Sequence, residues 1–473
     1  MLDPDYIDKA GDMVAAAYTQ IEAEMLDYLV AQMLLDEKLT SRGYTSLAML
    51  AQTHDGALRE ILRRNSGGIA AAVMASVEDA LKRSDEDDVR RLGGGRTAYP
   101  HQVAATVDGI ARILERDNLD MIDGAKRAFL EASTRAITSV NISATTPDKA
   151  IHEAVRQLER EGISIISYRN AATGRQTVKN KVDVAVRRHV RTQIAQDGAR
   201  MTLERMNELD VALVEVSSHP GARPEHAEWQ GRCYSLKGDV TIGGVRYRDF
   251  YSATGYGTVE GLLGANCRHS FAPYIHGTRH AYAHDPKHAS GVRGDEVYRL
   301  TQKQRYIERR IREAKRELRG AQAEYDADRS AEKLAEVMKA KQAIKSRQEA
   351  MRKLLEEANA KAKPGTSVLH RNQHREWAGD MPKTTGPART KHGTERMRER
   401  GITEKAAASA ITSPLKRFEA VADDNGRRAQ KLVGKDATVI VNPDTGEIVT
   451  AYKTKARIAR KYEREAKEAE NAG

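Results

Sequence analysis

The sequence predicts a multi-domain, mainly α-helical protein that also contains two small α+β parts. Three observations lead to this fold class. The chain has 473 residues, which is too long for one ordinary core. It is 31% charged and only 5% aromatic, a composition typical of long solvated helices. The helical spacing of its apolar residues is interrupted twice by glycine-rich segments without that spacing, first near residue 210 and again after residue 364.

Residues 1–205 are predicted to form a helical N-terminal portion. Apolar residues between Met13 and Leu29 recur at steps of three and four, so they form one stripe on a helix. The segment 175–201 is also predicted to be helical, because Val178, Val182, Val186, Val190 and Ile194 would share one face. Basic residues surround that face. They could contact an acidic partner, but a solvated face of a packed helix is the simpler interpretation.

Residues 206–290 are predicted to form a small α+β module that carries the most unusual motif of the chain. Alternation over 210–218 indicates its first strand, and the stretches HPGARPEHAEWQGRC (219–233) and GANCRHSFAPY (264–274) follow. Cys267 and His269 could bind zinc, completed by His219, His226 or Cys233, although the spacing lacks a CxxC pair. Cys267 could instead be a nucleophile. We favour a third interpretation, in which Trp229 packs a small core and the polar side chains hold the loops by hydrogen bonds.

Residues 296–363 are predicted to form a helical arm without chemistry of its own. Apolar residues from Ile307 to Tyr325 follow the 4,3 spacing of a coiled coil, and the pattern resumes from Leu334 to Leu355 after the interruption DADRS. The interruption makes an antiparallel hairpin at least as plausible as a single rod. Residues 364–388 are rich in proline, glycine and threonine and are expected to be a linker.

Residues 389–461 are predicted to form a small α+β domain, followed by a charged helical tail at 462–473. Two short helices, the second with Thr403 as its N-cap, should pack on a four-stranded antiparallel sheet. Asn425-Gly426 and the segment 443–446 indicate tight turns between strands.

The charge distribution indicates an acidic partner for this last domain. The chain has a net charge of +11, and residues 383–461 contain 18 Lys and Arg against 9 Asp and Glu. A local excess of this kind is typical of nucleic-acid contact. We expect no membrane anchor, because no stretch has the roughly 20 apolar residues that span a bilayer, and the first residues do not resemble a signal peptide. The two cysteines are expected to be free thiols in a cytoplasm.

The motif of the central module resembles the phage minor capsid protein 2 family, which is similar in layout to the Mu F-like head morphogenesis proteins. The resemblance rests on HPGARPEHAEWQG (219–231), YSATGYG (251–257), GLLGANCRHS (261–270) and the Pro273-Tyr274 pair, and it extends over roughly residues 1–360. It implies a minor component of a tailed-phage head, found in the virion and during assembly in the host cytoplasm, with the portal and other head proteins as partners. It implies no enzyme and no cofactor for residues 1–363. The residues of this structural motif are His219, Arg223, His226, Trp229, Gly231, Asn266, Cys267, Arg268 and His269.

The last domain offers candidate residues for phosphodiester cleavage without a metal. His392 could act as the base, with Glu395 as an alternative, while Arg396 and Lys431 could stabilise a phosphate and Thr450 and Tyr452 could orient it. The pattern resembles small RNases of the barnase–EndoU–colicin E5/D–RelE type, over about 75 residues. The resemblance implies a toxin-like RNase. Nucleic-acid binding without cleavage and a purely structural role are the alternatives.

Overall fold

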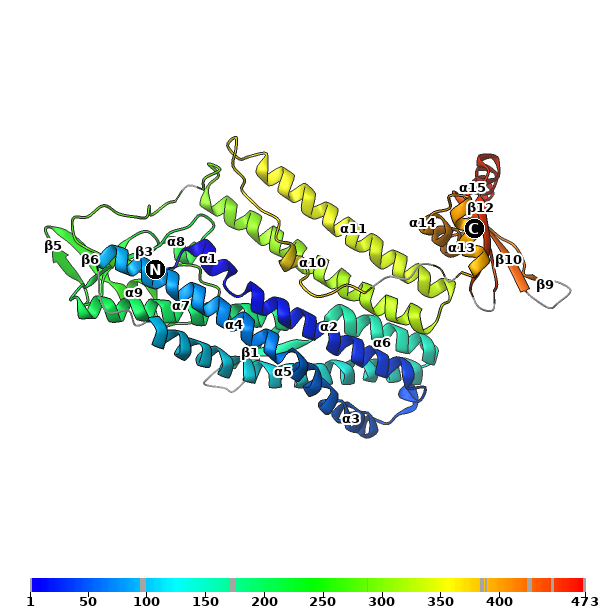
Figure 1. Ribbon diagram of the computed structural model, residues 1–473, viewed down its shortest axis with the longest axis horizontal. Coiled ribbons are helices and arrows are strands. Elements are labelled where there is room, and N and C mark those ends of the chain that lie inside the picture. Colours follow the sequence, from blue (N-terminus) through cyan, green and yellow to red (C-terminus); the bar gives the residue numbers. More distant parts are fainter. Residues whose placement is uncertain are drawn as a thin grey trace.

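The computed structural model describes residues 2–93, 99–169, 176–286, 288–382, 387, 389–422, 428–443 and 446–470, and it confirms the mainly helical prediction. The N-terminal body consists of α1 (Pro4–Lys9), α2 (Asp12–Leu35), a 3-10 turn (Leu39–Ser41), α3 (Tyr44–Thr53), α4 (Asp55–Leu92), α5 (Tyr99–Asn141), α6 (Pro147–Glu161) and α7 (Val182–Glu208). Figure 1 shows α2, α4 and α5 running along the length of this body. Among the described residues, none of the helices is both long and apolar enough to cross a membrane.

Helix α2 lies at the centre of the body, packed against α4, α6, α7 and the later helix α10. Tyr18, Ile21, Met25 and Leu29 are fully buried, as the apolar stripe predicts. Met13, which begins that stripe, is instead 58% exposed, because it lies in the first turn, where the surrounding helices leave it uncovered. The helix buries far more than one stripe because neighbours surround it.

The prediction of a helix from residue 175 was wrong for its first part. Residues Gln176–Lys181 form strand β2, which pairs antiparallel with β1 (Ser164–Arg169), and α7 begins only at Val182. Strand pairing satisfies the backbone through a partner distant in sequence, which a helical periodicity count does not detect. From that point the prediction is confirmed, since Val182, Val186, Val190 and Ile194 are all fully buried.

The central module is built on a five-stranded sheet with the order β5-β6-β4-β3-β7. Its elements are β3 (Leu213–Val216), α8 (Pro224–Ala227), β4 (Cys233–Ser235), β5 (Val240–Ile242), β6 (Val245–Asp249), α9 (Phe250–Thr254) and β7 (Phe271–Tyr274). Strand β3 pairs antiparallel with both β4 and β7, while β4 and β6 are parallel. This pairing brings the residues that follow β3 close to those that precede β7, and these are the two halves of the motif.

The predicted arm is an antiparallel hairpin of α10 (Gly294–Ala327) and α11 (Ala331–Asn359), as the interrupted heptads allow. Ile311, Leu318, Tyr325, Leu334 and Met351 of its seam are buried. Figure 1 shows the hairpin lying along the body, and α10 packs on α2 and α6. The hairpin is therefore a layer of the body as well as an arm.

Residues 364–382, which we call the strap, run back along the hairpin (Figure 1). The strap contains the short helix α12 (Gln373–Glu376), and Val368, Leu369 and Trp377 are buried. Arg319 of α10 donates a hydrogen bond to the carbonyl oxygen of Asp380. Its composition predicts a linker, but this part of 364–388 is packed against the body. The free energy gained by burial of three large apolar side chains exceeds the conformational entropy lost when the segment becomes ordered.

The C-terminal domain has the predicted elements: α13 (Lys391–Glu399), α14 (Glu404–Thr412), β8 (Lys416–Arg417), β9 (Val421–Ala422), β10 (Arg428–Val433), β11 (Ala437–Val441), β12 (Ile448–Lys453) and α15 (Ala456–Glu470). The antiparallel order is β12-β11-β10-β8, and β9 also pairs with β10, so two short strands precede β10 where one strand was predicted. Thr403 caps α14 by accepting from the amide of Ala406. The turn at Asn425-Gly426 lies outside the described residues, as do two residues of the turn at 443–446.

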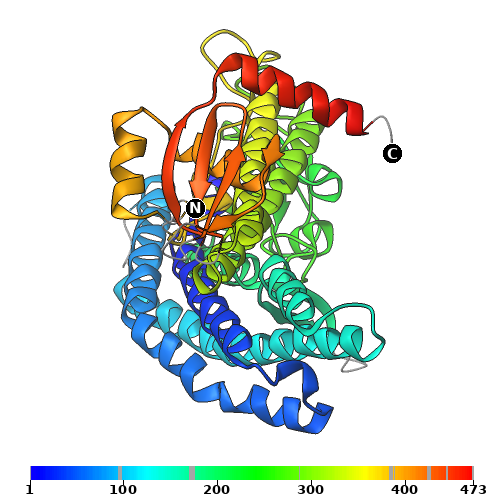
Figure 2. The same cartoon turned by 90° about the vertical axis from the view of Figure 1, so that its right-hand side faces the viewer.

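The C-terminal domain shares a hydrophobic core with the turn end of the hairpin. Leu318, Tyr325 and Leu334 of the hairpin belong to the same buried cluster as Ile411 of α14 and Leu432 of β10. Figure 2, which views this end of the molecule, shows the sheet in front of the hairpin and α15 crossing one end of the sheet. The domain thus packs against the turn end of the hairpin.

Candidate functional site: an arginine-lined cavity beside the histidine motif

The two halves of the motif converge on one buried cluster of rings. His219 lies in the loop after β3, His226 is on α8, and His269 lies just before β7. The ring centroids of His219 and His269 are 4.4 Å apart, those of His226 and Trp229 4.5 Å, and those of Trp229 and His269 4.8 Å. All four side chains are buried. Trp229 is buried as predicted, but it belongs to the large core that the module shares with the helical body and not to a small core of its own.

Gln230 connects the two halves by hydrogen bonds. Its Oε1 atom accepts from the backbone amide of His219 at 3.1 Å and from Nε2 of His269 at 3.0 Å. An amide oxygen can only accept, so Nε2 of His269 carries the proton and Nδ1 faces Sγ of Cys267 at 3.7 Å. Burial lowers the pKa of His269 far below its usual range, which keeps this ring neutral.

Gly231 and Asn266 shape the loops of the motif. Gly231 has φ of +63°, and a Cβ atom there would lie 2.3 Å from the carbonyl oxygen of Ala283, so only glycine fits. Asn266 also has positive φ, at +60°, and its side chain accepts a hydrogen bond from Nη2 of Arg191 at 3.0 Å. Both residues therefore have backbone roles that explain their place in the motif.

Among the described residues, two groups of side chains could each hold a metal ion, and the cysteine and histidine residues of the motif are divided between them. His226, Cys267 and His269 place one ligand atom each within 4.8 Å of one another, whereas Cys233 lies with Glu215 and His280 in a different group. Nη2 of Arg223 lies 2.8 Å from Nε2 of His226, and burial raises the pKa of the Cys267 thiol. Zinc requires a thiolate and tolerates a nearby guanidinium poorly, so this setting suits an anion better than a divalent cation.

Beside this cluster lies a cavity of about 340 Å³ whose walls carry nine arginines. They come from four parts of the chain: Arg187, Arg188 and Arg191 from α7, Arg223 and Arg268 from the motif, Arg305, Arg309 and Arg312 from α10, and Arg375 from the strap. His219, His226, His269 and Asn266 complete the motif's share of the wall, and Glu308 is its one carboxylate.

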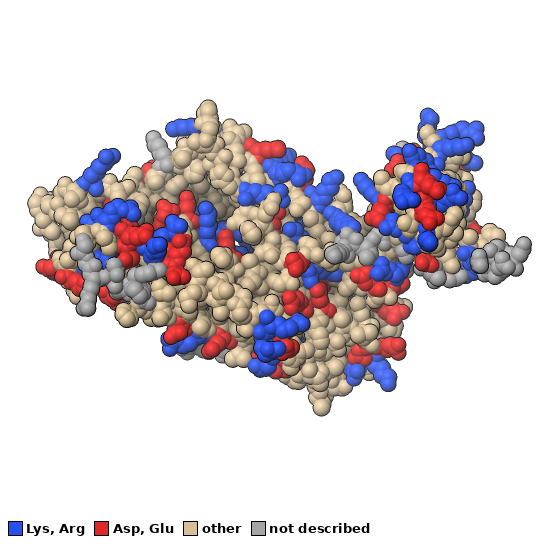
Figure 3. Space-filling view, viewed as in Figure 1, with Lys and Arg blue, Asp and Glu red and all other residues tan. Residues whose placement is uncertain are grey.

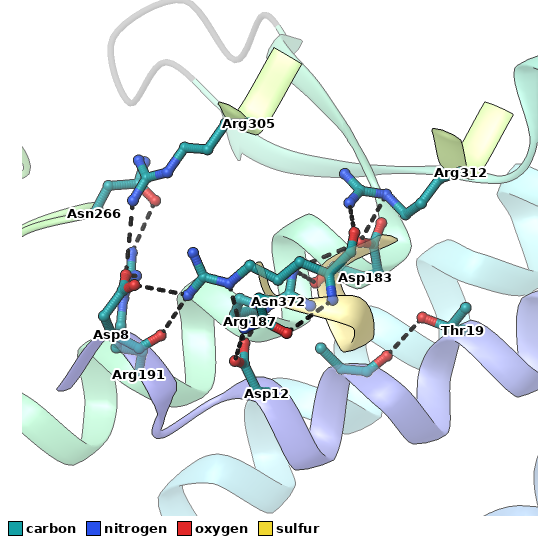
Figure 4. Close-up of polar contacts among 12 residues, drawn as sticks. Asp8, Asp12, Thr19, Asp183, Arg187, Arg191, Asn266, Arg305, Arg312 and Asn372 are labelled. Atoms are coloured by element: carbon teal, nitrogen blue, oxygen red, sulfur yellow. Dashed lines mark hydrogen bonds and ion pairs between the residues drawn. The ribbon is translucent and has the colours of Figure 1, made fainter. Parts of the chain in front are cut away.

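Three aspartates behind the wall hold several of these arginines in place (Figure 4). Asp8 accepts from Arg375 at 2.8 Å and from Arg191 at 3.1 Å, and its carboxylate lies 3.6 Å from Arg305. Figure 4 also shows Asp12 beside Arg187 and Asp183 beside Arg312. Nε of Arg187 donates a hydrogen bond to Oδ1 of Asp12 at 2.7 Å.

Burial and the charges of the arginines together determine the protonation of the groups around the cavity. Burial alone would raise the pKa of Asp8, but Arg375, Arg268 and Arg191 together hold it well below its usual range. Burial lowers the pKa of Arg191 to about 10. Burial and the charge of Arg268 lower the pKa of His219 to about 3, so this histidine is neutral at physiological pH. The cavity is therefore lined by ionised arginines and neutral histidines.

Sequence reasoning found the motif's part of this cavity and missed the rest. The missed arginines lie on helices that we assigned to packing and to an arm without chemistry. A signal existed, because Arg187 and Arg191 are four residues apart, and Arg305, Arg309 and Arg312 follow at four and three, so each set shares one helix face. Their convergence on the motif depends on the packing of α7 and α10 on the same helix, α2.

In the C-terminal domain the structure brings only some of the predicted catalytic residues together. On α13, Nε of Arg396 lies 3.4 Å from Nε2 of His392, and Arg396 also pairs with Glu399 at 2.9 Å. Lys431, Ile440 and Thr450 are opposite one another in β10, β11 and β12, so Lys431 and Thr450 share a sheet face with Tyr452.

That sheet face is the one turned away from α13 and α14, whose core partners are Leu432, Val439 and Ala451. Helix α13 nevertheless borders the edge strand β12, since Nη1 of Arg400 donates to the carbonyl oxygen of Ala451 at 2.9 Å. Among the described residues, no hydrogen bond joins the α13 pair to Lys431, Thr450 or Tyr452. Glu395, the alternative base, is exposed on α13.

The comparisons with known proteins agree with the class that the motif predicts, a capsid protein of a bacteriophage. The chain matches the family described as phage minor capsid protein 2 over residues 2–356. Since this match covers most of the chain, the protein belongs to the phage minor capsid protein 2 family. The C-terminal domain lies outside the match.

The chain is also similar to a protein called "Structural protein" of Lactococcus phage LL-H. The two are 24% identical over 194 residues, which is 40% of this chain and 49% of that relative, so the match spans about half the relative's length. No solved structure matches.

Proposed function

We propose that this protein is a portal-associated minor head protein whose C-terminal domain is a metal-independent RNase. The head assignment follows from family membership. The shape supports a bridging role, because the hairpin connects a module at one end of the elongated body with a basic domain at the other (Figure 1). A protein of this layout can contact head proteins through the body while the last domain reaches nucleic acid.

Cross-linking of purified heads tests the portal association. Lysine-specific cross-linking followed by mass spectrometry should connect this protein with the portal protein, and the cross-links should involve exposed lysines of the body such as Lys303. Cross-links to the major shell protein alone would contradict portal association and leave the family assignment intact.

The surface of the C-terminal domain supports contact with nucleic acid. Figure 3 shows Lys and Arg side chains gathered on this domain at one end of the molecule. Lys416, Arg417, Lys431, Lys453 and Arg460 are exposed. Such residues bind phosphates through neutralisation of charge, so affinity should fall steeply with salt concentration.

The proximity of His392 and Arg396 is the observation that carries the proposed RNase activity. In metal-free cleavage of RNA, a base removes the proton of the 2′-hydroxyl, and a cation stabilises the negative charge that develops on the phosphate. His392 and Arg396 offer these two groups on one helix, 3.4 Å apart. Lys431, Thr450 and Tyr452 lie on the sheet face turned away from α13, so they would bind flanking phosphates of an RNA strand that passes around the edge strand β12.

The full-length chain is the correct material for the test, because the C-terminal domain shares its core with the hairpin. Incubated with tRNA and total RNA in EDTA, it should cut the RNA, and His392→Ala and Arg396→Ala should each lower the rate by at least ~100-fold. Lys405→Ala, an exposed change of equal charge on α14, should cut at the wild-type rate.

The same preparations distinguish cleavage from binding. Intact RNA that is nevertheless retarded in a gel would support the alternative, in which the basic domain binds nucleic acid without cleaving it. Loss of cutting in proportion to charge, with Lys405→Ala as harmful as Arg396→Ala, would also exclude His392 and Arg396 as a catalytic pair.

A further inference from the structure

We propose that the arginine-lined cavity between α7, α10, the motif and the strap binds a compact anion that carries two or more phosphate groups. Family membership assigns no ligand to this cavity, and the proposal does not depend on the RNase. It rests on three properties of the site: its charge, the arginines that protein carboxylates leave unneutralised, and its size.

The cavity has a large excess of positive charge. Its wall holds nine arginines and one carboxylate, Glu308. Asp8, Asp12 and Asp183 behind the wall form ion pairs with five of these arginines, Arg187, Arg191, Arg305, Arg312 and Arg375, so these three carboxylates do not neutralise even the arginines that they contact. Like charges this close repel one another strongly where water is partly excluded, so a bound anion would lower the energy of the folded protein.

Three of the arginines have contacts that leave their charge available to a ligand. Among the residues that the structure describes, Arg223, Arg268 and Arg309 take part in no ion pair. Arg223 contacts His226 and the carbonyl oxygen of Glu260. Arg268 contacts His219 and the carbonyl oxygen of Gly221.

Arg309 lies over the ring of Tyr306, with its Cζ atom 5.9 Å from the ring centroid. Its side chain is exposed, whereas Arg191 on the opposite wall is buried, with its Nε atom unbonded within the described chain. The arginines therefore extend from the exposed rim into the buried part of the cavity.

Asp8 holds two of the other arginines in a fixed orientation. Arg191 is held between Asp8 and Asn266, and Arg375 is held by Asp8. A guanidinium binds phosphate through paired, directional N–H groups, so arginines that are already oriented lose little entropy on binding.

Size and charge favour an oligophosphate over other anions. A volume of about 340 Å³ is at the lower end of the range for small-molecule pockets, about 300–1,000 Å³. A single carboxylate would supply only one negative charge for Arg223, Arg268 and Arg309 together. Two or three linked phosphates supply enough charge within a small volume, and arginine forks match their oxygens.

Calorimetric titration of the full-length protein with sodium tripolyphosphate tests the proposal. We expect saturable binding at one site per chain and a rise in Tm, because a ligand that binds only the folded state stabilises it. Arg268→Gln and Arg309→Glu should each weaken binding about tenfold or more, the loss expected for one charge-assisted hydrogen bond. ATP in parallel shows the source of the phosphates: equal affinity indicates a bare oligophosphate, and tighter binding indicates a nucleotide.

Lys303→Glu is the matched control, because Lys303 is exposed on the same helix as Arg309, changes the charge equally and does not line the cavity. It should leave the affinity within about twofold. Arg309 is itself exposed, so its replacement should not prevent folding, and the circular dichroism spectrum verifies this. Two results would overturn the proposal: no saturable binding of tripolyphosphate or ATP, or equal weakening by Lys303→Glu and Arg309→Glu.

Discussion

Arg375 donates a hydrogen bond to Asp8, with Nη2 2.8 Å from Oδ2, and so connects two residues that are 367 positions apart. Arg375 lies in the strap and Asp8 in the first helix. The same carboxylate contacts Arg191 of α7 and Arg305 of α10. One aspartate therefore joins four separate parts of the chain around the cavity.

Asp8→Asn should destabilise the protein by about 3 kcal/mol, because removal of one partner from a largely buried ion pair leaves uncompensated charge. Three arginines would lose their common anion. Urea unfolding at pH 7 measures the change. Asp5→Asn, an exposed change on the same helix, should alter the free energy of unfolding by less than ~0.5 kcal/mol. Equal effects of the two substitutions would argue against a special role for Asp8.

The stabilisation from Asp8 should disappear in acid. The folded pKa of Asp8 lies below its ordinary value because of Arg375, Arg268 and Arg191, which outweigh its burial. An acid with a depressed pKa contributes its full stability above the unfolded pKa, near 3.9, and loses it as the pH falls further. The difference in urea midpoint between wild type and Asp8→Asn should therefore stay constant from pH 7 to about 5 and narrow as the pH falls from about 4 to 3, and it would vanish only below the folded pKa of Asp8. A difference that stays constant over the whole range would contradict this assignment.

Glu159 should produce the opposite pH dependence. It is fully buried on α6, neither carboxyl oxygen has a hydrogen-bond partner among the described residues, and burial raises its pKa to about 8. Between the unfolded pKa near 4.3 and pH 8, only the unfolded state releases the proton, so stability falls as the pH rises.

Glu159→Gln removes this titration and should become more stable than wild type as the pH rises from 5 to 8. The difference should grow by up to about 1.4 kcal/mol per pH unit. Denaturant unfolding at pH 5, 6.5 and 8 checks it. Glu153→Gln on the same helix is the control, because Glu153 is exposed. A wild-type profile that is flat across this range would show that Glu159 does not retain its proton.

Leu334→Ala should loosen the C-terminal domain although the residue belongs to the hairpin. Leu334 is buried in the cluster that includes Ile411 and Leu432. Truncation of a buried leucine costs about 2–5 kcal/mol. Hydrogen exchange should therefore accelerate in β10–β12.

Leu354→Ala is the control for this change. Leu354 is equally buried on α11, but it lies in a different cluster at the far end of the hairpin. It should leave exchange in β10–β12 unchanged. If both variants accelerate exchange in those strands equally, the stability of the domain does not depend on its packing against the turn end of the hairpin.

Gly231→Ala should destabilise the motif module by more than backbone strain alone. The added Cβ would lie 2.3 Å from the carbonyl oxygen of Ala283, at a residue with φ of +63°. Gly238→Ala is a matched control, since φ there is +81° and nothing lies within 4 Å. It should cost about 1–2 kcal/mol, the strain of a left-handed conformation, and Gly231→Ala should cost clearly more. Thermal unfolding of the two variants compares them directly, and equal shifts would indicate that the loop at Ala283 moves aside.

Local patterns predicted the elements of this protein well where neighbouring residues determine them. Heptad spacing with an interruption indicated the hairpin, and a capping threonine with alternating strands indicated the C-terminal domain. The helix expected from residue 175 failed at β2, because strand pairing depends on a partner elsewhere in the chain.

The sequence by itself determined the family motif, the helical class and the basic character of the last domain, because composition, periodicity and motif are properties of neighbouring residues. Only the tertiary structure decided that Arg191, Arg268, Arg309 and Arg375 face one cavity, since they come from a body helix, a loop, the hairpin and a segment that was expected to be a linker. Their mutual repulsion opposes this arrangement, and the packing of both α7 and α10 on α2, with the carboxylate of Asp8 among the arginines, overcomes it. The repulsion among the arginines and the burial that outweighs it both arise only when the chain is folded.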